Sequence, residues 1–215
     1  RVPRSMLSDR AAIRAAHIIL ASGSPRRVQI FNEILQLDAR VVASTFPEDL
    51  DKSQYTPSEY VAENARQKAL EVYGRLKSEG EPTPSLVVGA DTVVVLGDAI
   101  LEKPKSEDAA KAMLARLSGG SHEVLSGVAL IYGVEGAEPH IDTFVEKTAV
   151  DFGKLPAEVI DAYVASGEPM DKAGSYGIQG AGGSFVSGIR GCYHNVVGFP
   201  MHRFCTKLDT SRLKK

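Results

Sequence analysis

Residues 85–104, SLVVGADTVVVLGDAILEKP, constrain the fold more than any other part of the chain. The apolar runs at 86–88 and 92–96 are too continuous for a strand with one solvated face. They are typical of a central strand that is covered on both sides, and LGDA at 96–99 predicts a hairpin turn. We therefore predict an α/β chain with a mixed β-sheet flanked by helices.

The rest of the chain supplies further strand-like and helical segments. Strands are predicted at 17–22, 40–44, 122–133 and 143–155. Helices are predicted from Pro25, over 58–76 with Ser58 as N-cap, over 106–117 with Ser106 as N-cap, over 156–166, and from Pro200. A glycine-rich loop at 168–185 precedes a predicted hairpin at 184–198.

Composition narrows the class of protein. The 215 residues are 43% hydrophobic and 24% charged, as in ordinary globular proteins, and a net charge of −2 argues against binding to a nucleic-acid polymer. No apolar run is long enough to span a bilayer, and Cys192 and Cys205 lack zinc-ligand spacing. We expect a cytoplasmic protein with a single domain at 17–215, preceded at 1–16 by an extension, a tag remnant or part of a transit peptide.

Asp91 interrupts the apolar strand, where an unpaired carboxylate would cost several kcal/mol. An Asp at a Gly-Ala-Asp-Thr break can face a cleft, where it holds a divalent ion or acts on water as a general base. The alternative is a carboxylate that nearby backbone amides satisfy at a bulge.

The segment SGSPRR at 22–27 combines two hydroxyls, the start of a helix, and Arg26 and Arg27. Amides at a helix start bind anions, and arginine can bind phosphate oxygens through two hydrogen bonds. The alternative is a serine N-cap followed by two solvated arginines. No GxxxxGK[ST] string occurs, so a P-loop does not explain the segment.

Two further segments carry candidate ligand contacts. Lys103 ends the predicted strand in LEKP, and Gln179 lies between glycines in GSYGIQG, where its amide could read a base edge. Single polar residues of this kind are otherwise solvated surface. No GxSxG elbow and no GxGxxG after the first strand is present, which removes support for a serine hydrolase or a dinucleotide fold.

The order of motifs ASGSPRR, GADTVV, LEKP, LSGGSHEV, EPMDKAGSYGIQG and NVVGFP resembles the Maf family of nucleoside triphosphate pyrophosphatases, over about residues 17–204. It is also close to a vertebrate Maf-like domain joined to an acetylserotonin O-methyltransferase-like domain, which is not expected within these residues. The resemblance implies an elongated, two-lobed fold of the inosine triphosphatase type, with a twisted sheet, a central cleft and a tendency to form homodimers.

The resemblance also implies an activity: hydrolysis of a nucleoside triphosphate between the α and β phosphates, with magnesium, or manganese, as cofactor. Asp91 would be the catalytic proton acceptor, and Glu48 would join Asp91 as a metal ligand. The positions matched to substrate choice are Arg26, Thr92 and Gln179, and those matched to triphosphate contacts are Ser24, Arg27, Lys68 and Lys103.

The glycine-rich loop, with its Gln, resembles that of the subfamily that acts on dTTP, UTP and related nucleotides. This implied specificity has a chemical basis, since a Gln amide can meet the O4/N3–H edge of uracil or thymine. Alternatives are a 7-methyl-GTP pyrophosphatase and a non-catalytic, nucleotide-binding regulator of cell division. A sheet-based interaction module is a third reading, and it leaves Asp91 unexplained.

Overall fold

The computed structural model describes residues 9–213, which form two compact units. The first unit contains residues 9–91, Gly127–Val145 and 198–213, and the second contains Thr92–Ser126 and Glu146–Val197. The strands β3 (Leu86–Leu96), β5 (Ser121–Tyr132) and β6 (His140–Phe152) contribute residues to both units.

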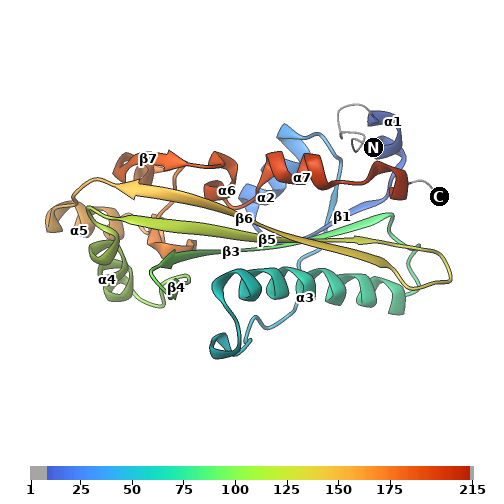
Figure 1. The fold of residues 1–215 in the computed structure, drawn as a ribbon, viewed down its shortest axis with the longest axis horizontal. Coiled ribbons are helices and arrows are strands. Elements are labelled where there is room, and N and C mark those ends of the chain that lie inside the picture. The colour runs from blue at the N-terminus through green and yellow to red at the C-terminus, as the bar shows by residue number, and fades with distance from the viewer. Residues whose placement is uncertain (1–8, 214–215) are drawn as a thin grey trace. The chain divides into compact units, whose positions relative to one another are not determined.

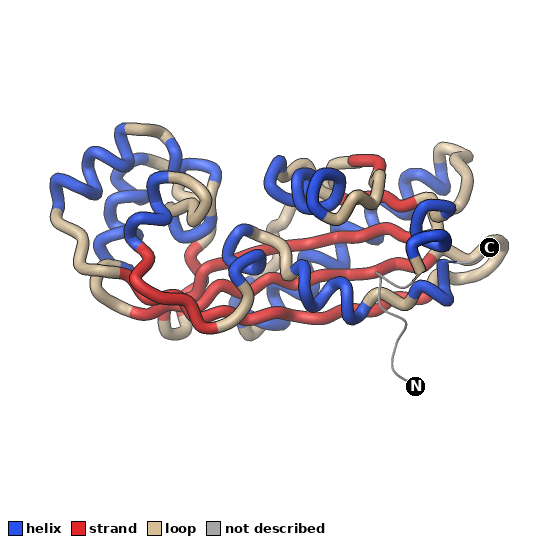
Figure 2. Tube along the Cα trace, turned by 90° about the horizontal axis from the view of Figure 1, so that it is seen from above, coloured by secondary structure: helices blue, strands red, loops and turns tan. Residues whose placement is uncertain are grey.

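The strands form one seven-stranded sheet with the order β2-β1-β3-β5-β6-β7, and β4 also pairs with β3 (Figures 1 and 2). β1 (Ile18–Ala21) runs parallel to β2 (Arg40–Val41) and to β3. β4 (Ala99–Leu101) and β7 (Val186–Arg190) are antiparallel to β3 and β6. The predicted mixed sheet is therefore confirmed, with β3 as an interior strand that is buried along most of its length.

In the first unit, helix α3 (Pro57–Ser78) covers one face of the strands, while α2 (Pro25–Val28) and α7 (Met201–Lys207) cover the other (Figure 1). The core beneath α3 consists of aliphatic side chains together with Tyr73. A Cβ added at Gly89 would lie 2.2 Å from the Ala65 carbonyl oxygen, and one at Gly127 would lie 2.2 Å from the Val61 carbonyl oxygen. The two glycines therefore let the backbone of α3 rest directly on β3 and β5.

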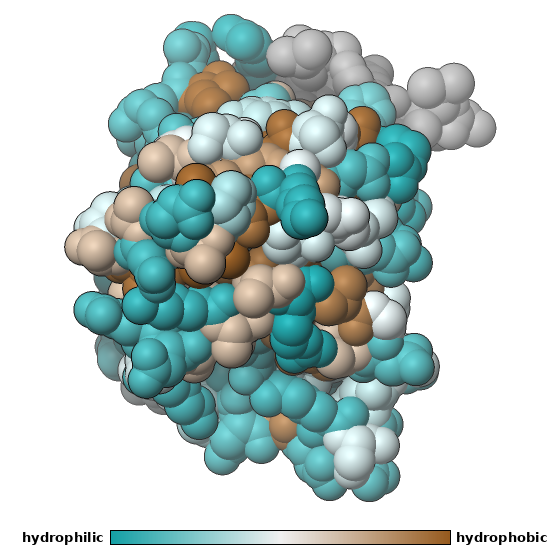
Figure 3. Space-filling model, turned by 90° about the vertical axis from the view of Figure 1, so that its left-hand side faces the viewer, coloured by the Kyte–Doolittle hydropathy of each residue, from teal (hydrophilic) through white to brown (hydrophobic). Residues whose placement is uncertain are grey.

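In the second unit, α4 (Glu107–Leu117) and α5 (Ala157–Ala165) enclose a core that includes Leu114, Phe152 and Tyr163. On the face seen in Figure 3, hydrophobic residues are interspersed among hydrophilic ones. The remaining short elements of the two units are α1 (Arg10–Ala15), α6 (Tyr193–Val197), the π-helix η2 (Gln29–Ile34) and the 3-10 turns η3 (Lys52–Gln54), η4 (Glu168–Asp171), η5 (Ala173–Ser175), η6 (Ala181–Phe185) and η7 (Thr210–Leu213).

Two predicted boundaries in the first unit are wrong. The strand predicted at 40–44 ends at Val41, because the following backbone bonds to α3 instead: Arg75 donates to the Ala43 carbonyl oxygen at 2.9 Å. α3 begins at Pro57 rather than Ser58, because Thr56 and Glu59 form a reciprocal capping box.

The helical segment after Pro25 and the predicted hairpin also need correction. From Gln29 the segment is a π-helix, which buries Ile30 and Phe31 but leaves Ile34 exposed. The chain at 184–198 forms β7 and then α6 rather than two strands, because buried Asn195 on α6 donates hydrogen bonds to the Val124 carbonyl oxygen and the Thr148 hydroxyl.

The predictions for 106–117, 156–166 and the segment after Pro200 are confirmed as α4, α5 and α7. Within the N-terminal extension, residues 1–8 lie outside the described part of the chain, while α1 buries Ile13. Among residues 9–213, no helix is both long and apolar enough to cross a membrane.

Candidate active site

The candidate site of the first unit lies where β1 ends beside the middle of β3. The parallel register pairs Ala21 with Gly89, so Ser22 follows β1 next to the point at which Ala90 and Asp91 continue β3. β3 passes through this point without a break, and Asp91 is only 7% exposed. A long, largely apolar strand thus carries a carboxylate into the interior of the unit.

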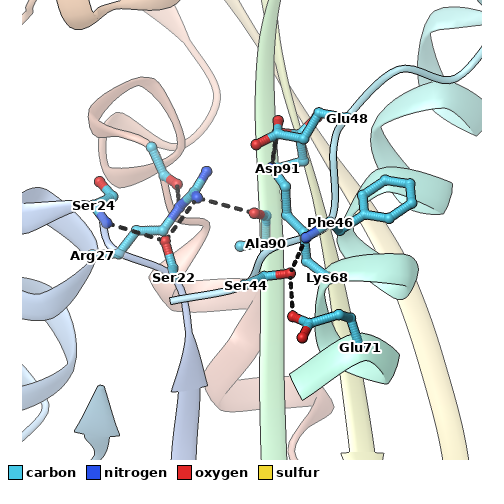
Figure 4. Close-up of polar contacts among 11 residues, drawn as sticks. Ser22, Ser24, Arg27, Ser44, Phe46, Glu48, Lys68, Glu71, Ala90 and Asp91 are labelled. Atoms are coloured by element: carbon cyan, nitrogen blue, oxygen red, sulfur yellow. Dashed lines mark hydrogen bonds and ion pairs between the residues drawn. The ribbon is translucent and has the colours of Figure 1, made fainter. Parts of the chain in front are cut away.

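Lys68 of α3 provides the counter-charge for Asp91 (Figure 4). Its Nζ donates to Asp91 Oδ1 at 2.8 Å and lies 2.7 Å from Glu48 Oε2. The side chains of Lys68 and Asp91 are each 10% exposed, whereas that of Glu48 is 50% exposed. Asp91 is therefore satisfied by an ammonium group, not by backbone amides at a bulge, and one cation joins two carboxylates.

The loop that carries Glu48 is tied to α3 by Glu71 and Arg75. Glu71 Oε2 accepts hydrogen bonds from the Ser44 hydroxyl and the Thr45 amide, both at 2.9 Å, and Glu71 Oε1 pairs with Arg75 Nε at 2.7 Å. Partial burial acts to raise the pKa of Glu71, but the hydrogen bonds from Arg75, Thr45 and Ser44 outweigh it and lower the pKa to about 2. Glu71 is thus held as a carboxylate that orders the loop.

Glu48 itself has a φ of 55°, in the left-handed region that non-glycine residues seldom occupy. Such a conformation persists when the surrounding contacts hold it, and it is frequent at functional sites. Here the backbone turns at the residue whose carboxylate reaches Lys68.

Arg27 stands on the other side of Ala90 (Figure 4). Its Nη1 donates to the Ala90 carbonyl oxygen at 2.9 Å and to Ser22 Oγ at 3.1 Å, and its Nε donates to the Gly198 carbonyl oxygen at 2.9 Å. Burial lowers the pKa of Arg27, while the carboxylates of Asp91 and Glu48 raise it. Arg27 therefore braces the backbone of β3, and its predicted phosphate contact would be made by an already anchored guanidinium.

The interpretation of SGSPRR as a serine cap with two solvated arginines is wrong. Ser24 occupies the N-cap position of α2, but its hydroxyl makes no capping hydrogen bond, and its amide donates to Ser22 Oγ at 3.3 Å. Arg26 lies on α2 beside Arg27, partly buried.

Three predicted site residues belong to the second unit. Thr92 shares a hydrogen bond of 2.8 Å with Ser126 through their hydroxyls. Lys103 follows β4 and is exposed, and Gln179 is exposed in the glycine-rich loop. The structure thus brings Arg27, Lys68, Asp91 and Glu48 together within the first unit, and the roles predicted for the residues of the second unit stay predictions.

The donor set suits a hard cation. Among residues 9–213 no group of three or more His, Cys, Asp or Glu side chains is arranged to hold a metal ion. However, Asp91 and Glu48 already converge on one positive charge, the ammonium of Lys68. Mg²⁺ commonly takes one or two carboxylates and completes its shell with water and substrate phosphates, so this pair fits such an ion.

Sequence reasoning missed the residues that position the loop, namely Ser44, Glu71 and Arg75. Glu71 and Arg75 are four residues apart on a helix, a spacing that indicates an ion pair. That spacing does not reveal that the other oxygen of Glu71 binds a loop some 26 residues earlier in the sequence.

The chain matches the family model described as Maf-like protein over residues 17–211. A human protein named probable bifunctional dTTP/UTP pyrophosphatase/methyltransferase protein is 47% identical, over 89% of this chain and 31% of its own length. Proteins named dTTP/UTP pyrophosphatase are 45% identical in Clostridium perfringens, over 89% of this chain and 95% of that one, and 46% identical in Bacillus cereus, over 89% and 93%. This chain therefore spans about a third of the human relative and nearly all of the bacterial ones.

Among solved structures, the Staphylococcus aureus Ham1 protein aligns over 63% of this chain and 71% of its own, with a TM-score of 0.41 and 17% identity. A likeness at this level adds nothing to the argument on the fold or on the site.

Proposed function

This chain belongs to the Maf-like family, and on that premise we propose that it is a nucleoside triphosphate pyrophosphatase for dTTP, UTP and related nucleotides. The products are the nucleoside monophosphate and pyrophosphate. The observation that carries the proposal is the buried Asp91 carboxylate held by Lys68 beside an anchored arginine. Relatives at 42–47% identity that are named dTTP/UTP pyrophosphatase support the choice of substrate.

In the proposed reaction Asp91 accepts a proton from the water that attacks the α phosphorus. Its Oδ1 is engaged by Lys68, so Oδ2 is the oxygen that takes the proton. The burial of Asp91 limits competition from bulk water for this oxygen. The bond between the α phosphorus and the bridging oxygen breaks, and pyrophosphate leaves.

The cationic groups of the first unit bind the phosphates. Lys68, Arg26 and Arg27 supply positive charge, and the hydroxyl of Ser24 stands at the start of α2, where the helix dipole favours an anion. Because Arg27 is fixed by three hydrogen bonds, little reorganisation is needed to present its charge. Lys103 is a further proposed phosphate contact, and Thr92 is proposed to act in substrate choice with Arg26.

A magnesium or manganese ion held by Asp91 and Glu48 would neutralise charge on the phosphate oxygens. Glu48 is the more exposed of the two carboxylates, and its loop is ordered by Glu71. In the absence of that ion, the same two carboxylates are neutralised in part by Lys68.

The test is a panel of dTTP, UTP, CTP and 7-methyl-GTP, assayed with Mg²⁺ for monophosphate and pyrophosphate. We expect dTTP and UTP to give the highest kcat/KM. A wide preference for 7-methyl-GTP would move the chain to the other specificity. Nucleotide binding without pyrophosphate release from any of the four would replace the enzyme with a nucleotide-binding regulator.

We extend the proposal to a homodimer, which the resemblance to the family implies, and to a location in the cytoplasm. Light scattering of the purified chain should give twice the mass of 23.0 kDa, and a mass of one chain would contradict the dimer. Fractionation of cells followed by immunodetection would test the location.

A further inference from the structure

Gln179 stands at the corner of a tight turn in the second unit. The Gly180 amide donates to the Gly177 carbonyl oxygen at 3.2 Å, which places Ile178 and Gln179 at the two central positions of the turn. The side chain of Gln179 is exposed, while Gly177 is buried. The turn thus presents the side-chain amide of Gln179 to solvent, while its first residue, Gly177, is held in the interior of the unit.

Both ends of this turn are bonded to one pair of side chains, Tyr163 of α5 and Glu168 of η4. The Tyr163 hydroxyl donates to Glu168 Oε1 at 2.9 Å and accepts a hydrogen bond from the Gly177 amide at 3.1 Å. Beyond the turn, Glu168 Oε2 accepts from the Ala181 amide at 3.0 Å, and Oε1 accepts from the Gly182 amide at 3.3 Å. A phenol therefore holds the entry to the turn and a carboxylate holds its exit.

The glycines of GIQGAGG are required by this arrangement. A Cβ at Gly180 would lie 2.3 Å from Glu168 Oε1, and a Cβ at Gly182 would lie 2.6 Å from the Tyr163 hydroxyl. Neither methyl group fits unless the pair moves. The backbone therefore packs directly against Tyr163 and Glu168, with no room for a side chain between them.

Tyr163 and Glu168 are suited to a fixed role. Tyr163 is 5% exposed; burial raises its pKa and the Glu168 carboxylate adds to the increase, although the Gly177 hydrogen bond opposes them. The phenol therefore remains protonated across the neutral range and can donate to Glu168 continuously. Nothing in the proposed chemistry uses either residue directly.

We propose that Tyr163 and Glu168 are positioning residues for Gln179: they fix the turn that sets the Gln179 amide against the base of the substrate, and so act on nucleotide choice. This inference rests on the proposed function. It predicts that loss of the pair acts through the base contact and leaves the chemistry at the phosphates intact.

The test compares UTP with CTP, which share ribose and triphosphate and differ only on the base edge. In Tyr163→Phe we expect the ratio of kcat/KM for UTP to that for CTP to fall about fivefold, which corresponds to the loss of one hydrogen bond between Gln179 and the base. The fall should come from a higher KM for UTP, with kcat unchanged. In a Gln179→Ala background, Tyr163→Phe should have no further effect on the ratio, because the amide through which Tyr163 acts is absent.

Tyr132→Phe is the matched control, since the Tyr132 hydroxyl also accepts a backbone hydrogen bond, from the Asp209 amide at 3.0 Å in the first unit. It should leave the ratio unchanged. If Tyr163→Phe does not fold, Glu168→Gln, which keeps the size of the side chain, replaces it in the same cycle.

Different outcomes overturn the proposed function and the positioning role. Absence of pyrophosphate release from dTTP, UTP, CTP and 7-methyl-GTP alike by the unaltered chain overturns the proposed function and this inference together. An active chain whose ratio is the same in Tyr163→Phe, or falls equally with and without Gln179, overturns the positioning role alone.

Discussion

The acid–lysine cluster of the first unit, formed by Glu48, Lys68 and Asp91, and the glycine turn of the second unit, formed by residues 177–180, are built in opposite ways. The cluster balances a buried carboxylate with an ammonium group, and its third member is half exposed. The turn is held by backbone amides that donate to a phenol and a carboxylate.

The difference separates two physical demands. A buried group that is to accept a proton as a carboxylate needs a counter-charge beside it, and Lys68 provides one for Asp91 at 2.8 Å. A group that reads a base needs a fixed position, which hydrogen bonds to the backbone provide at little electrostatic cost. Changes in the cluster should therefore alter turnover and stability, whereas changes around the turn should alter selectivity.

The largest expected effect is that of Asp91→Asn. It removes the proton acceptor and should lower kcat by about 10²- to 10⁴-fold, with nucleotide binding retained. Pyrophosphate release and a binding titration measure the two parts. Asp161→Asn breaks an exposed lysine pair, to Lys111 at 2.7 Å, and is the matched control that should keep kcat. Near-normal turnover in Asp91→Asn would remove Asp91 from the chemistry.

Lys68→Met comes next, because it leaves Asp91 buried without its cation. We expect the free energy of unfolding to fall by about 3 kcal/mol, as when one partner of a buried ion pair is removed. Urea unfolding measures this fall. Lys111→Met, on the exposed pair, should shift the urea midpoint little. Equal shifts of the urea midpoint in Lys68→Met and Lys111→Met would show that the buried ion pair contributes no more to stability than the exposed one.

The second unit should respond to acid through His122. Its Nε2 bonds to the Tyr176 hydroxyl at 2.9 Å, next to the glycine turn, and burial lowers its pKa to about 4 despite the opposing charge of Asp151. The unfolded chain therefore takes up the proton first, near pH 6.5. Stability is full above pH 6.5 and should fall by about 3 kcal/mol as the pH drops to 4.

Urea unfolding at several pH values tests this expectation. His122→Asn should remove most of the slope between pH 6.5 and 4, and His140→Asn, whose side chain is 41% exposed, should retain it. An unchanged slope in His122→Asn would assign the acid response to other groups.

The smallest effect is expected for Glu71→Gln, which loosens the loop of Glu48 without touching the proposed chemistry. We expect kcat/KM to fall about threefold to tenfold, and the loss should diminish at saturating Mg²⁺. Glu63→Gln removes a pair on the same helix, to Arg66 at 2.8 Å, and should have no such effect.

Glu71 also gives this comparison a pH dependence. Because its pKa in the folded chain is lowered to about 2, its contribution to stability is present above about pH 4.5 and is lost as the pH falls toward 2. That window lies below the one of His122, so the two units should lose stability in different acid ranges. If the stability losses that His122→Asn and Glu71→Gln remove covered the same pH range, the separation would be contradicted.

The sequence predicted the elements whose evidence is local. The two apolar runs of β3, the Ser106 cap of α4 and the unusual Asp91 could all be interpreted from neighbouring residues. β2 and α6 could not, because each depends on contacts distant in the sequence: Arg75 donates to the backbone that follows β2, and Asn195 of α6 donates to β5 and β6.

The candidate site shows the same limit. A resemblance to a family placed Lys68 and Glu48 among the candidates, yet their shared bond became visible only in the fold. Arg27 was expected to face a phosphate, and nothing in SGSPRR showed that it also braces Ala90 and Gly198. Tertiary hydrogen bonds of long side chains have no periodic signal in the sequence.

Gly89 has a consequence for anyone who engineers this protein. It lies two residues before Asp91, and its missing side chain is what lets the backbone of α3 at Ala65 approach β3. Lys68 lies about one helical turn after Ala65, so this close approach also sets the distance between the Lys68 backbone and the Asp91 carboxylate. A design library that varies the charged residues and keeps Gly89 would therefore preserve the spacing between α3 and β3 on which their contact depends.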